Sequence, residues 1–302
     1  MRLLKKEKDY TQVIPESLND LWYLHNRLDD RIIEQKTLRT KVVKKGGEIL
    51  KGKKVPQIIA IKVEKKKWDG DKVRATGRIF SGSERNKYHS LNLEIDKKIK
   101  VSGELKNPPK EKRYEILICI VDKSEADFRV YESGTVTPLK KVPAKGREKE
   151  FYKEISNKLQ KEGKMFLLAG PGNTKEKIAK LLDREFTLDN LSCGGERGYK
   201  ELLKRGSIKK IIEMMRDKKE EECVKRFLVE IIKNADKVCY GTELEKNIDK
   251  IKEILILSSL VPKYEILMGK LEKNNATINV VNDEKEWCRE IMKFEIIGLC
   301  WY

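Results

Sequence analysis

Apolar side chains recur at helical spacing early in the chain and then at the shorter spacing of β-strands. Residues 15–28, PESLNDLWYLHNRL, place leucines and Trp22 on one helical face behind the start signal Ser17. Runs rich in β-branched residues follow between Gly, Asp and Lys clusters, at residues 31–43, 57–68, 71–80 and 88–95. Residues 1–108 are therefore predicted to form a small, strongly curved sheet or barrel with one helix.

A different pattern begins after a linker, KNPPKEKR, at residues 106–113. Its Pro108-Pro109 pair removes backbone donors and interrupts the apolar pattern. Residues 113–216 then alternate strand runs such as YEILICIV and MFLLAG with amphipathic helical stretches. Strands that alternate with helices predict an α/β domain.

Residues 217–302 repeat this class with a core of their own. The stretch EEECVKRFLVEIIKN has one apolar helical face, EILIL and TINVV are typical of buried strands, and YEILMGKLEKN lies between them as a helix. The predicted fold class is a multi-domain α+β and α/β chain. Its domains are a small β domain with one helix at 1–108, a central α/β domain at 113–216 and a C-terminal α/β domain at 217–302.

Charge differs between these three parts. The chain has a net charge of +18 over 302 residues, which favours a polyanionic partner, and nucleic acid is the first candidate. Residues 1–112 carry a net charge of +13, residues 113–216 carry +7 and residues 217–302 carry −2. The first two parts are therefore expected to contact a polyanion, and the last part to contact protein.

Cysteine and histidine usage argues against a structural zinc site. There are six Cys with no CxxC pair and two His, whereas zinc needs four clustered thiolate or imidazole ligands. Reduced and mostly buried thiols are expected instead. The first residues lack an apolar signal region, and no stretch approaches ~20 consecutive apolar residues. A cytoplasmic chain is expected.

Two short stretches allow more than one interpretation. AGPGNTK lies between a strand and a helix but lacks the spacing of a phosphate-binding loop, so Asn173 or Thr174 as a helix cap explains it better. The stretch YHS, with Lys87 before it, mixes cationic and stacking groups. It is either an RNA contact or a barrel turn that contains a histidine.

The basic stretch LKKVPAKGREKEFY also has two interpretations. It is either a solvated charged face or an exposed loop from which Lys145 and Arg147 bind phosphates. SCGGERGYKELLKRG, residues 192–206, has three: a phosphate cradle, a relative of the Gly-Gly-Gln tip of release factors, or a turn before a helix. No Ser/His/Asp or Cys/His constellation stands out, so the residues alone indicate an RNA-binding protein with a protein-binding C-terminal domain.

The order of the motifs adds a resemblance. PESLNDLWYLHNRL, TLRTKV, YHSLNLEI, EADFRVYE, VPAKGREKEFY, LAGPGNTKE, CGGERGYKELLKRG and VCYGTELEKN follow one another along nearly the whole chain. In this order they resemble the archaeal Pelota family, stalled-ribosome factors related to class 1 release factors. Release factors carry their Gly-Gly-Gln tip where this chain has VPAKGREKEFY, which lacks that triplet. The resemblance thus implies that Gly194-Gly195-Glu196 is a structural turn and that peptidyl-tRNA hydrolysis is absent.

The resemblance implies a role in ribosome rescue during mRNA surveillance. The chain would bind the empty A site of a stalled ribosome, delivered by a GTP-bound elongation factor 1 alpha type GTPase. An ATP-binding-cassette recycling ATPase would then drive subunit splitting. This role requires no cofactor, and a monomer without membrane association is expected.

The resemblance also assigns roles to the three domains. The first would be an Sm-like barrel near the decoding centre, with rRNA or mRNA contacts at Arg39, Lys41, Lys87, Tyr88 and His89. The second would reach toward the peptidyl-transferase centre and the GTPase with the basic residues Lys140, Lys141, Lys145 and Arg147. The third would bind the protein partners. Its end departs from the family, with Phe294-Glu295-Ile296 where relatives have a Gly-Gly turn.

An enzymatic alternative is a divalent-metal-dependent endoribonuclease, an activity described for members of this family and placed in the first domain. Metal-assisted phosphodiester cleavage needs carboxylates that converge on Mg²⁺ or Mn²⁺, and the candidates are Asp9, Glu16 and Asp20. A generic RNA-binding protein is a third alternative. It would explain the charge but not the order of the motifs.

Overall fold

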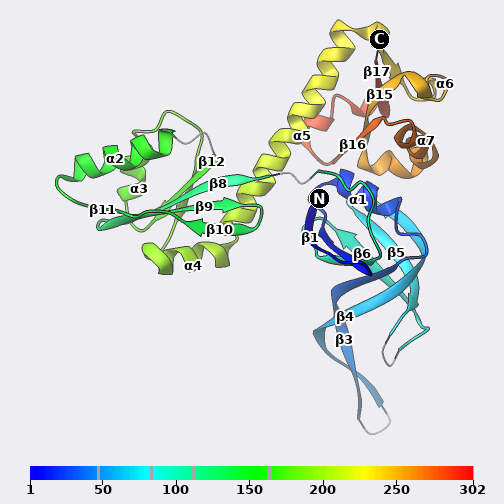
Figure 1. Ribbon diagram of the computed structural model, residues 1–302, viewed down its shortest axis with the longest axis horizontal. Coiled ribbons are helices and arrows are strands. Elements are labelled where there is room, and N and C mark those ends of the chain that lie inside the picture. The colour runs from blue at the N-terminus through cyan, green and yellow to red at the C-terminus, as the bar shows by residue number, and fades with distance from the viewer. Residues whose placement is uncertain (46–47, 82–83, 111–112, 162–164, 302) are drawn as a thin grey trace. The chain divides into compact units, whose positions relative to one another are not determined.

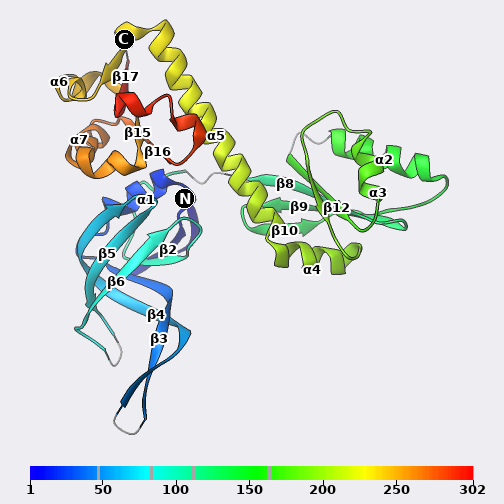
Figure 2. The same cartoon turned by 180° about the vertical axis from the view of Figure 1, so that it is seen from behind.

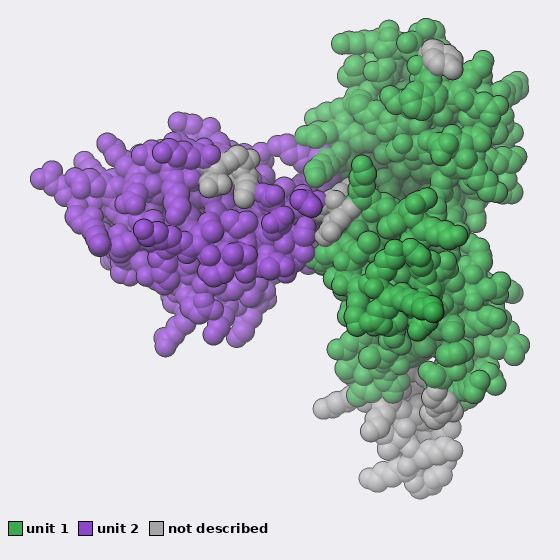
Figure 3. Space-filling view, viewed as in Figure 1, with its two compact units in different colours: residues 1–111, 219–302 green, residues 112–218 purple. Residues whose placement is uncertain are grey.

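The structure is a computed structural model that describes residues 1–45, 48–81, 84–110, 113–161 and 165–301, and within residues 39–53 the backbone alone. Contacts divide the chain into two compact units (Figure 3). Unit 1 comprises residues 1–111 and 219–302, and unit 2 comprises residues 112–218. The first and third predicted domains fall in one unit, and the division into three domains stays a prediction.

The described residues of unit 1 begin with seven strands and one helix, and two of these strands precede the helix. They are β1 (Arg2–Lys6), β2 (Tyr10–Ile14), α1 (Leu18–His25), β3 (Ile32–Lys45), β4 (Glu48–Asp69), β5 (Lys72–Ile79), β6 (Tyr88–Glu94) and β7 (Ile99–Ser102). The strands form one curved antiparallel sheet in the order β1-β2-β7-β3-β4-β5-β6 (Figure 1). The four-residue strand β7 was not predicted, because so short a run has no readable alternation.

Helix α1 begins where the sequence predicted. The Ser17 side chain accepts a hydrogen bond from the backbone N–H of Asp20 at 3.4 Å, and Asn26 ends the helix. Leu21 and Leu24 are fully buried against the inner face of the sheet. The remaining faces of this short helix are buried too, which an isolated barrel could not achieve.

The C-terminal part of unit 1 buries the faces of α1 that the first sheet leaves uncovered. After α5 (Ser207–Lys233) its elements are β14 (Val238–Tyr240), α6 (Glu243–Lys246), β15 (Ile251–Leu257), α7 (Val261–Lys273), β16 (Thr277–Val281) and β17 (Ile296–Cys300). The four strands form a sheet in the order β14-β17-β15-β16. One face packs against α5 through Phe227, and the other packs against α7 and α1 (Figures 1 and 2).

The segment between β16 and β17 contains no α-helix among its described residues. It forms two 3-10 turns, at Glu286–Cys288 and Met292–Phe294. Glu295 then adopts a positive φ of 59°, a backbone conformation that favours glycine. Hydrogen bonds from Lys263, at 2.5 Å, and from Tyr264 anchor its carboxylate.

Glu272 of α7 is the polar centre of the contact between α1 and the C-terminal sheet. Its carboxylate accepts hydrogen bonds from Trp22 Nε1 at 3.1 Å, from Asn26 Nδ2 at 2.8 Å and from the Arg27 guanidinium at 3.1 Å. The apolar side chains around it belong to one continuous buried cluster that draws on both sheets. The barrel and the C-terminal sheet therefore share a core.

Unit 2 is a sheet with helices on both faces, as the alternating pattern predicted. Its elements are β8 (Glu115–Val121), β9 (Glu125–Glu132), β10 (Thr135–Pro138), β11 (Val142–Pro143), α2 (Glu148–Lys161), β12 (Met165–Gly170), α3 (Thr174–Ala179), β13 (Thr187–Asn190), α4 (Gly195–Arg205) and the start of α5. The parallel strands β8, β12 and β13 lie side by side. Alternate residues of β8 pack against α2 and α3 on one face and against α4 and α5 on the other, which explains its unbroken apolar run.

The Gly-Gly-Glu triplet has a structural role, as interpreted from the sequence, but as the start of α4: Gly194 caps the helix, and Gly195 and Glu196 are its first two residues. A Cβ at Gly194 would lie 2.0 Å from an Asp122 carboxylate oxygen, and one at Gly198 would lie 2.3 Å from the Cys193 carbonyl oxygen. Glu196 pairs with Arg129 at 2.6 Å. Asn173 precedes α3 as predicted, although its side chain makes no capping hydrogen bond.

His25 lies at the contact between α1 and the C-terminal sheet and has 1% of its surface exposed. Its ring stacks on Trp22 at 5.7 Å between centroids and meets the edge of Trp68 at 6.3 Å. Burial lowers the pKa of His25 below its ordinary value, opposed by the charge of Glu265, whose carboxylate lies 3.8 Å from Nε2. The native state therefore holds this imidazole neutral.

We expect this burial to make unit 1 less stable in mild acid. The unfolded chain binds a proton at His25 near pH 6.5, whereas the native state binds it less readily because burial lowers the pKa of His25. The free energy of unfolding is therefore highest above that pH and decreases as the pH falls below it. The slope attributable to His25 approaches about 1.4 kcal/mol per pH unit where one proton separates the two states. Urea unfolding of the chain and of His25→Gln between pH 7 and pH 5 measures it.

The second histidine provides the control. His89→Gln should keep the acid-dependent loss, and His25→Gln should reduce it. Equal slopes in the two variants would contradict the assignment of the effect to His25.

Candidate nucleic-acid interface

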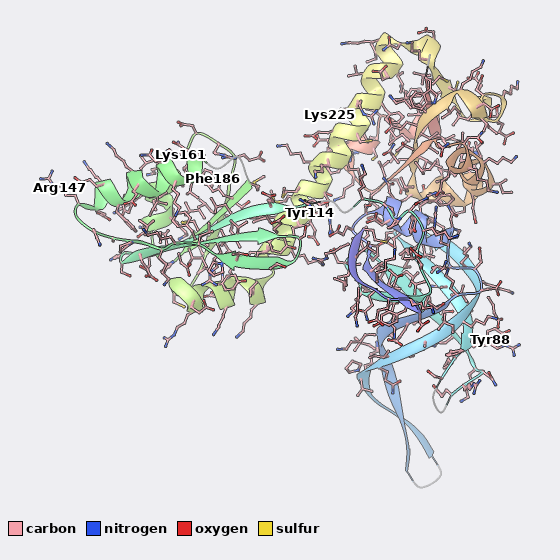
Figure 4. The ribbon with its side chains drawn as sticks, in the orientation of Figure 1. Tyr88, Tyr114, Arg147, Lys161, Phe186 and Lys225 are labelled. Carbon is pink, nitrogen blue, oxygen red and sulfur yellow. The ribbon has the colours of Figure 1, made fainter. Side chains whose placement is uncertain are left out.

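The outer face of the sheet formed by β3, β4, β5 and β6 carries large apolar side chains in solvent. Alternation along these strands turns Ile59, Ile61 and Ile79 inward, while Ile58 and Phe80 point outward with 69% and 49% of their surfaces exposed. Tyr88 on β6 is 62% exposed and lies at the surface of unit 1 (Figure 4). We call Lys36, Ile58, Lys62, Arg78, Phe80 and Tyr88 the outer sheet face.

Strand register brings the members of the outer sheet face together. Ile58 lies opposite Lys36, Lys62 lies opposite Arg78, and Arg78 lies opposite Tyr88. Cross-strand neighbours of this kind have Cβ atoms about 4.5–5.5 Å apart. Aromatic, aliphatic and cationic groups therefore alternate over adjacent positions of four strands.

Arg78 and Tyr88 form a preassembled pair on this face. The guanidinium carbon lies 5.3 Å from the centroid of the Tyr88 ring, and Arg78 Nε lies 3.2 Å from a Glu64 carboxylate oxygen. Contact with Tyr88, and to a lesser degree with Glu64, raises the pKa of Arg78, which therefore stays charged. A flat ring with a fixed cation beside it is suited to a nucleobase and its phosphate.

The RNA contacts predicted in the first domain do not all lie on the outer sheet face. Tyr88 belongs to the outer sheet face, and Lys87 is exposed beside it, 3.5 Å from Glu84. His89 is half-buried on β6 rather than in a turn, and it is paired with Gly77 across the sheet. The backbone of Arg39 and Lys41 lies on β3, but their side chains fall outside the described residues. Their roles as RNA contacts stay predictions.

Five members of the outer sheet face were not predicted: Lys36, Ile58, Lys62, Arg78 and Phe80. Alternation in DKVRATGRIF placed Arg78 and Phe80 on one face, but not which face was solvated. Which face of the sheet is solvated depends on α1, which packs against the inner side. Pairing of Lys62 with Arg78 depends in addition on a register shift between Val63 and Lys65.

The basic segment of unit 2 is exposed, which is compatible with both of its interpretations. Lys145 and Arg147 lie in solvent between β11 and α2, where the carbonyl of Arg147 accepts hydrogen bonds from the first turn of the helix (Figure 4). Lys141 donates to Glu125 at 2.6 Å, which raises the pKa of Lys141. Lys140 is exposed and receives a hydrogen bond from Lys158 at its carbonyl. All four stay predicted contacts.

The carboxylates considered for a metal site have another partner. Glu16 and Asp20 are 4% and 2% exposed, and both lie near the α-amino group of Met1, at 3.8 Å and 2.9 Å. Asp20 also accepts the backbone N–H of Glu16 at 2.7 Å, and Asp9 lies in solvent. Within the described ranges no three His, Cys, Asp or Glu side chains are grouped for a metal ion. These residues do not fit a divalent cation.

Comparison with known proteins confirms the resemblance. Residues 1–108 match the family described as the Pelota N-terminal domain. The protein pelota homolog of Methanococcus aeolicus is 27% identical over 99% of this chain and 98% of its own, and that of Pyrococcus furiosus is 26% identical over 93% of each. The resemblance therefore extends beyond the first domain.

Solved structures confirm the fold class, a mixed α+β chain of several domains. The crystal structure of Archaeoglobus fulgidus Pelota is 21% identical and superposes with a TM-score of 0.78 over 100% of this chain and 98% of that one. A model of ribosome-bound archaeal Pelota and ABCE1 is 23% identical, covers 100% of this chain and has a TM-score of 0.53. None of the helices in the described part of this chain is long and apolar enough to span a membrane.

We expect the outer sheet face to bind single-stranded RNA. Phe80→Ala and Tyr88→Ala should each weaken binding of a short unstructured RNA about tenfold or more, because a stacked base contributes about 1–3 kcal/mol. Lys62→Ala should in addition reduce the log-log salt slope by about 0.7, because it removes one phosphate contact. Fluorescence anisotropy over a salt series measures both quantities.

Trp301, an exposed aromatic residue of the C-terminal strand region, offers a matched control. Trp301→Ala should bind RNA like the parent chain. Equal affinity in Phe80→Ala, Tyr88→Ala and the parent would contradict the assignment of the face.

Proposed function

We propose that this chain, whose first 108 residues form a Pelota N-terminal domain, recognises stalled ribosomes and promotes their dissociation. It would enter an empty A site during mRNA surveillance and would leave peptidyl-tRNA intact. The proposal is supported by full-length similarity to pelota homologues. It is also supported by the fold that this chain shares with archaeal Pelota bound to the ribosome together with ABCE1.

The outer sheet face is the observation that carries the proposal. A single-stranded or splayed RNA offers unstacked bases and a polyanionic backbone, and this face offers exposed rings beside cations. The surrounding part of the chain carries a net charge of +13, which would draw it to a ribosome. We assign this face, together with Arg39, Lys41, Lys87 and His89, to contacts with mRNA or rRNA at the decoding centre.

The central part of the chain would contact RNA through its exposed basic segment. Lys145 and Arg147 project from a short connection ahead of α2, which suits a phosphate contact deeper in the A site. The segment has no Gly-Gly-Gln triplet, and the Gly-Gly-Glu triplet elsewhere is packed against Asp122. The chain therefore offers no glutamine-bearing tip to position water at a peptidyl ester.

The C-terminal part, with a net charge of −2, would bind protein partners. We propose a delivering GTPase of the elongation factor 1 alpha type and an ATP-binding-cassette recycling ATPase. Such a division requires no chemistry and no cofactor from this chain, because its partners hydrolyse the nucleotides. The proposed setting is cytoplasmic, with the chain acting as a monomer.

Reconstitution on stalled ribosomes tests the proposal. Ribosomes halted on an mRNA without a stop codon are mixed with the chain, the GTPase and the ATPase, and subunit splitting, mRNA and peptidyl-tRNA are followed together. We expect splitting with intact mRNA and intact peptidyl-tRNA. Released peptide, or metal-dependent mRNA cleavage without the partners, would contradict the proposal.

A double variant tests the role of the basic segment in the same assay. Lys145→Ala with Arg147→Ala should weaken ribosome binding by about a hundredfold or more, because each of the two lost charge-assisted contacts costs about 1.5 kcal/mol or more. Lys161→Ala with Lys180→Ala removes the same charge from exposed positions of unit 2 and should not change binding. Equal affinities for the two double variants would refute the assignment of the segment.

A further inference from the structure

Two cysteines that are 61 residues apart in the chain meet at the end of the C-terminal sheet. Cys239 lies on β14 and Cys300 ends β17, and their Sγ atoms are 3.6 Å apart. Both side chains are half-buried against the cluster that the barrel and the C-terminal sheet share. The other four cysteines of the chain are unpaired thiols, two of them fully buried.

Strand register explains why these thiols meet. Cys239 lies opposite Gly298 in the antiparallel ladder, and Cys300 is two residues further along the same face of β17. Gly298 has no side chain to separate them, and a Cβ there would already lie 3.2 Å from Leu244. No side chain therefore stands opposite Cys239, and the second thiol lies 3.6 Å away on the same face.

We propose that Cys239 and Cys300 form a reversible disulfide by exchange with a low-molecular-weight disulfide such as oxidised glutathione. The inference does not depend on the proposed ribosomal function. The gap of 3.6 Å between the two sulfur atoms must close to a bond of about 2.05 Å.

The reaction balances in two exchange steps. One cysteine loses its proton and attacks the small disulfide, which forms a mixed disulfide and releases one small thiol. The second cysteine loses its proton and attacks the mixed disulfide, which forms the Cys239–Cys300 bond and releases the second small thiol. The protein pair loses two electrons and two protons, and the small disulfide gains them.

The rate of this exchange should depend on pH. Burial and the neighbouring Cys300 raise the pKa of Cys239 to about 11, so little of this thiol is ionised at neutral pH. Exchange should therefore be slow at pH 7 and faster at pH 8.5. The same partial burial protects the bond from reduction once it has formed.

The bond would secure the weakest edge of the C-terminal sheet. β14 has three residues and lies at the edge of that sheet, where β17 is its one neighbour among the described strands, so it has few backbone hydrogen bonds. A cross-link from β14 to the last residue of β17 closes a 61-residue separation and restricts the unfolded chain. The expected result is a more stable sheet in an oxidising medium.

Thiol mapping of the full chain tests the proposal. The chain is equilibrated at pH 8.5 with oxidised and reduced glutathione in graded ratios, alkylated, digested and analysed by mass spectrometry. We expect one cross-linked peptide pair that contains Cys239 and Cys300, with alkylated Cys119, Cys193, Cys223 and Cys288. The thermal midpoint should rise by roughly 4 °C or more and return on reduction.

Two variants complete the test. Cys239→Ser should lose both the cross-link and the thermal shift, and Cys223→Ser should keep both because Cys223 lies on α5. Six alkylated cysteines in the parent chain at the most oxidising ratio would overturn the proposal. Glutathione retained on Cys239 or Cys300 of the parent, without a cross-link, would overturn it as well.

Discussion

The burial of one short helix, α1, is the constraint on which unit 1 depends. Six of its eight residues carry apolar or aromatic side chains, which lie on almost every face, so the curved sheet can cover only part of the helix. The C-terminal sheet and α7 cover the rest, and the carboxylate of Glu272 satisfies polar groups that this contact buries. The barrel and the C-terminal sheet thereby become one compact unit although about a hundred residues separate them in the chain.

This arrangement decides which surface of the barrel remains available. Because α1 fills the inner side of the sheet, the outward side of β3 to β6 keeps its rings and cations in solvent. Successive side chains of a strand point to opposite faces of the sheet, so the same strands provide one packed face and one face with exposed aromatic rings. We propose that the packed face stabilises the domain and that the exposed face contacts RNA.

Much of this architecture could be predicted because the informative signals are local. The Ser17 cap, the alternation in β5 and the start of α4 at glycine each depend on a few neighbouring residues, and each is present in the structure. The order of eight motifs identified the family although no single motif was specific. The mix of cationic and stacking groups around Tyr88 indicated an RNA contact, and that role stays a prediction.

What could not be predicted depends on contacts between distant segments. No sequence pattern near Trp22 predicts its hydrogen bond to Glu272. The spacing of Cys239 and Cys300 does not predict that they share a face of the sheet. Helix α5 runs through the predicted boundary at residue 216, because residues 207–233 contain neither Gly nor Pro to stop it. To predict the outer sheet face, one would have to know which side of the sheet α1 covers and where the register of β4 with β5 is irregular.

Site-specific photo-crosslinking tests most directly whether the outer sheet face meets RNA on the ribosome. A photoreactive phenylalanine analogue is placed at Phe80, and the chain is bound with its GTPase to ribosomes that have an empty A site. Our account predicts cross-links from this position to mRNA or rRNA at the decoding centre, and their loss when a cognate tRNA occupies the A site. Stable binding with cross-links to ribosomal protein alone would contradict it.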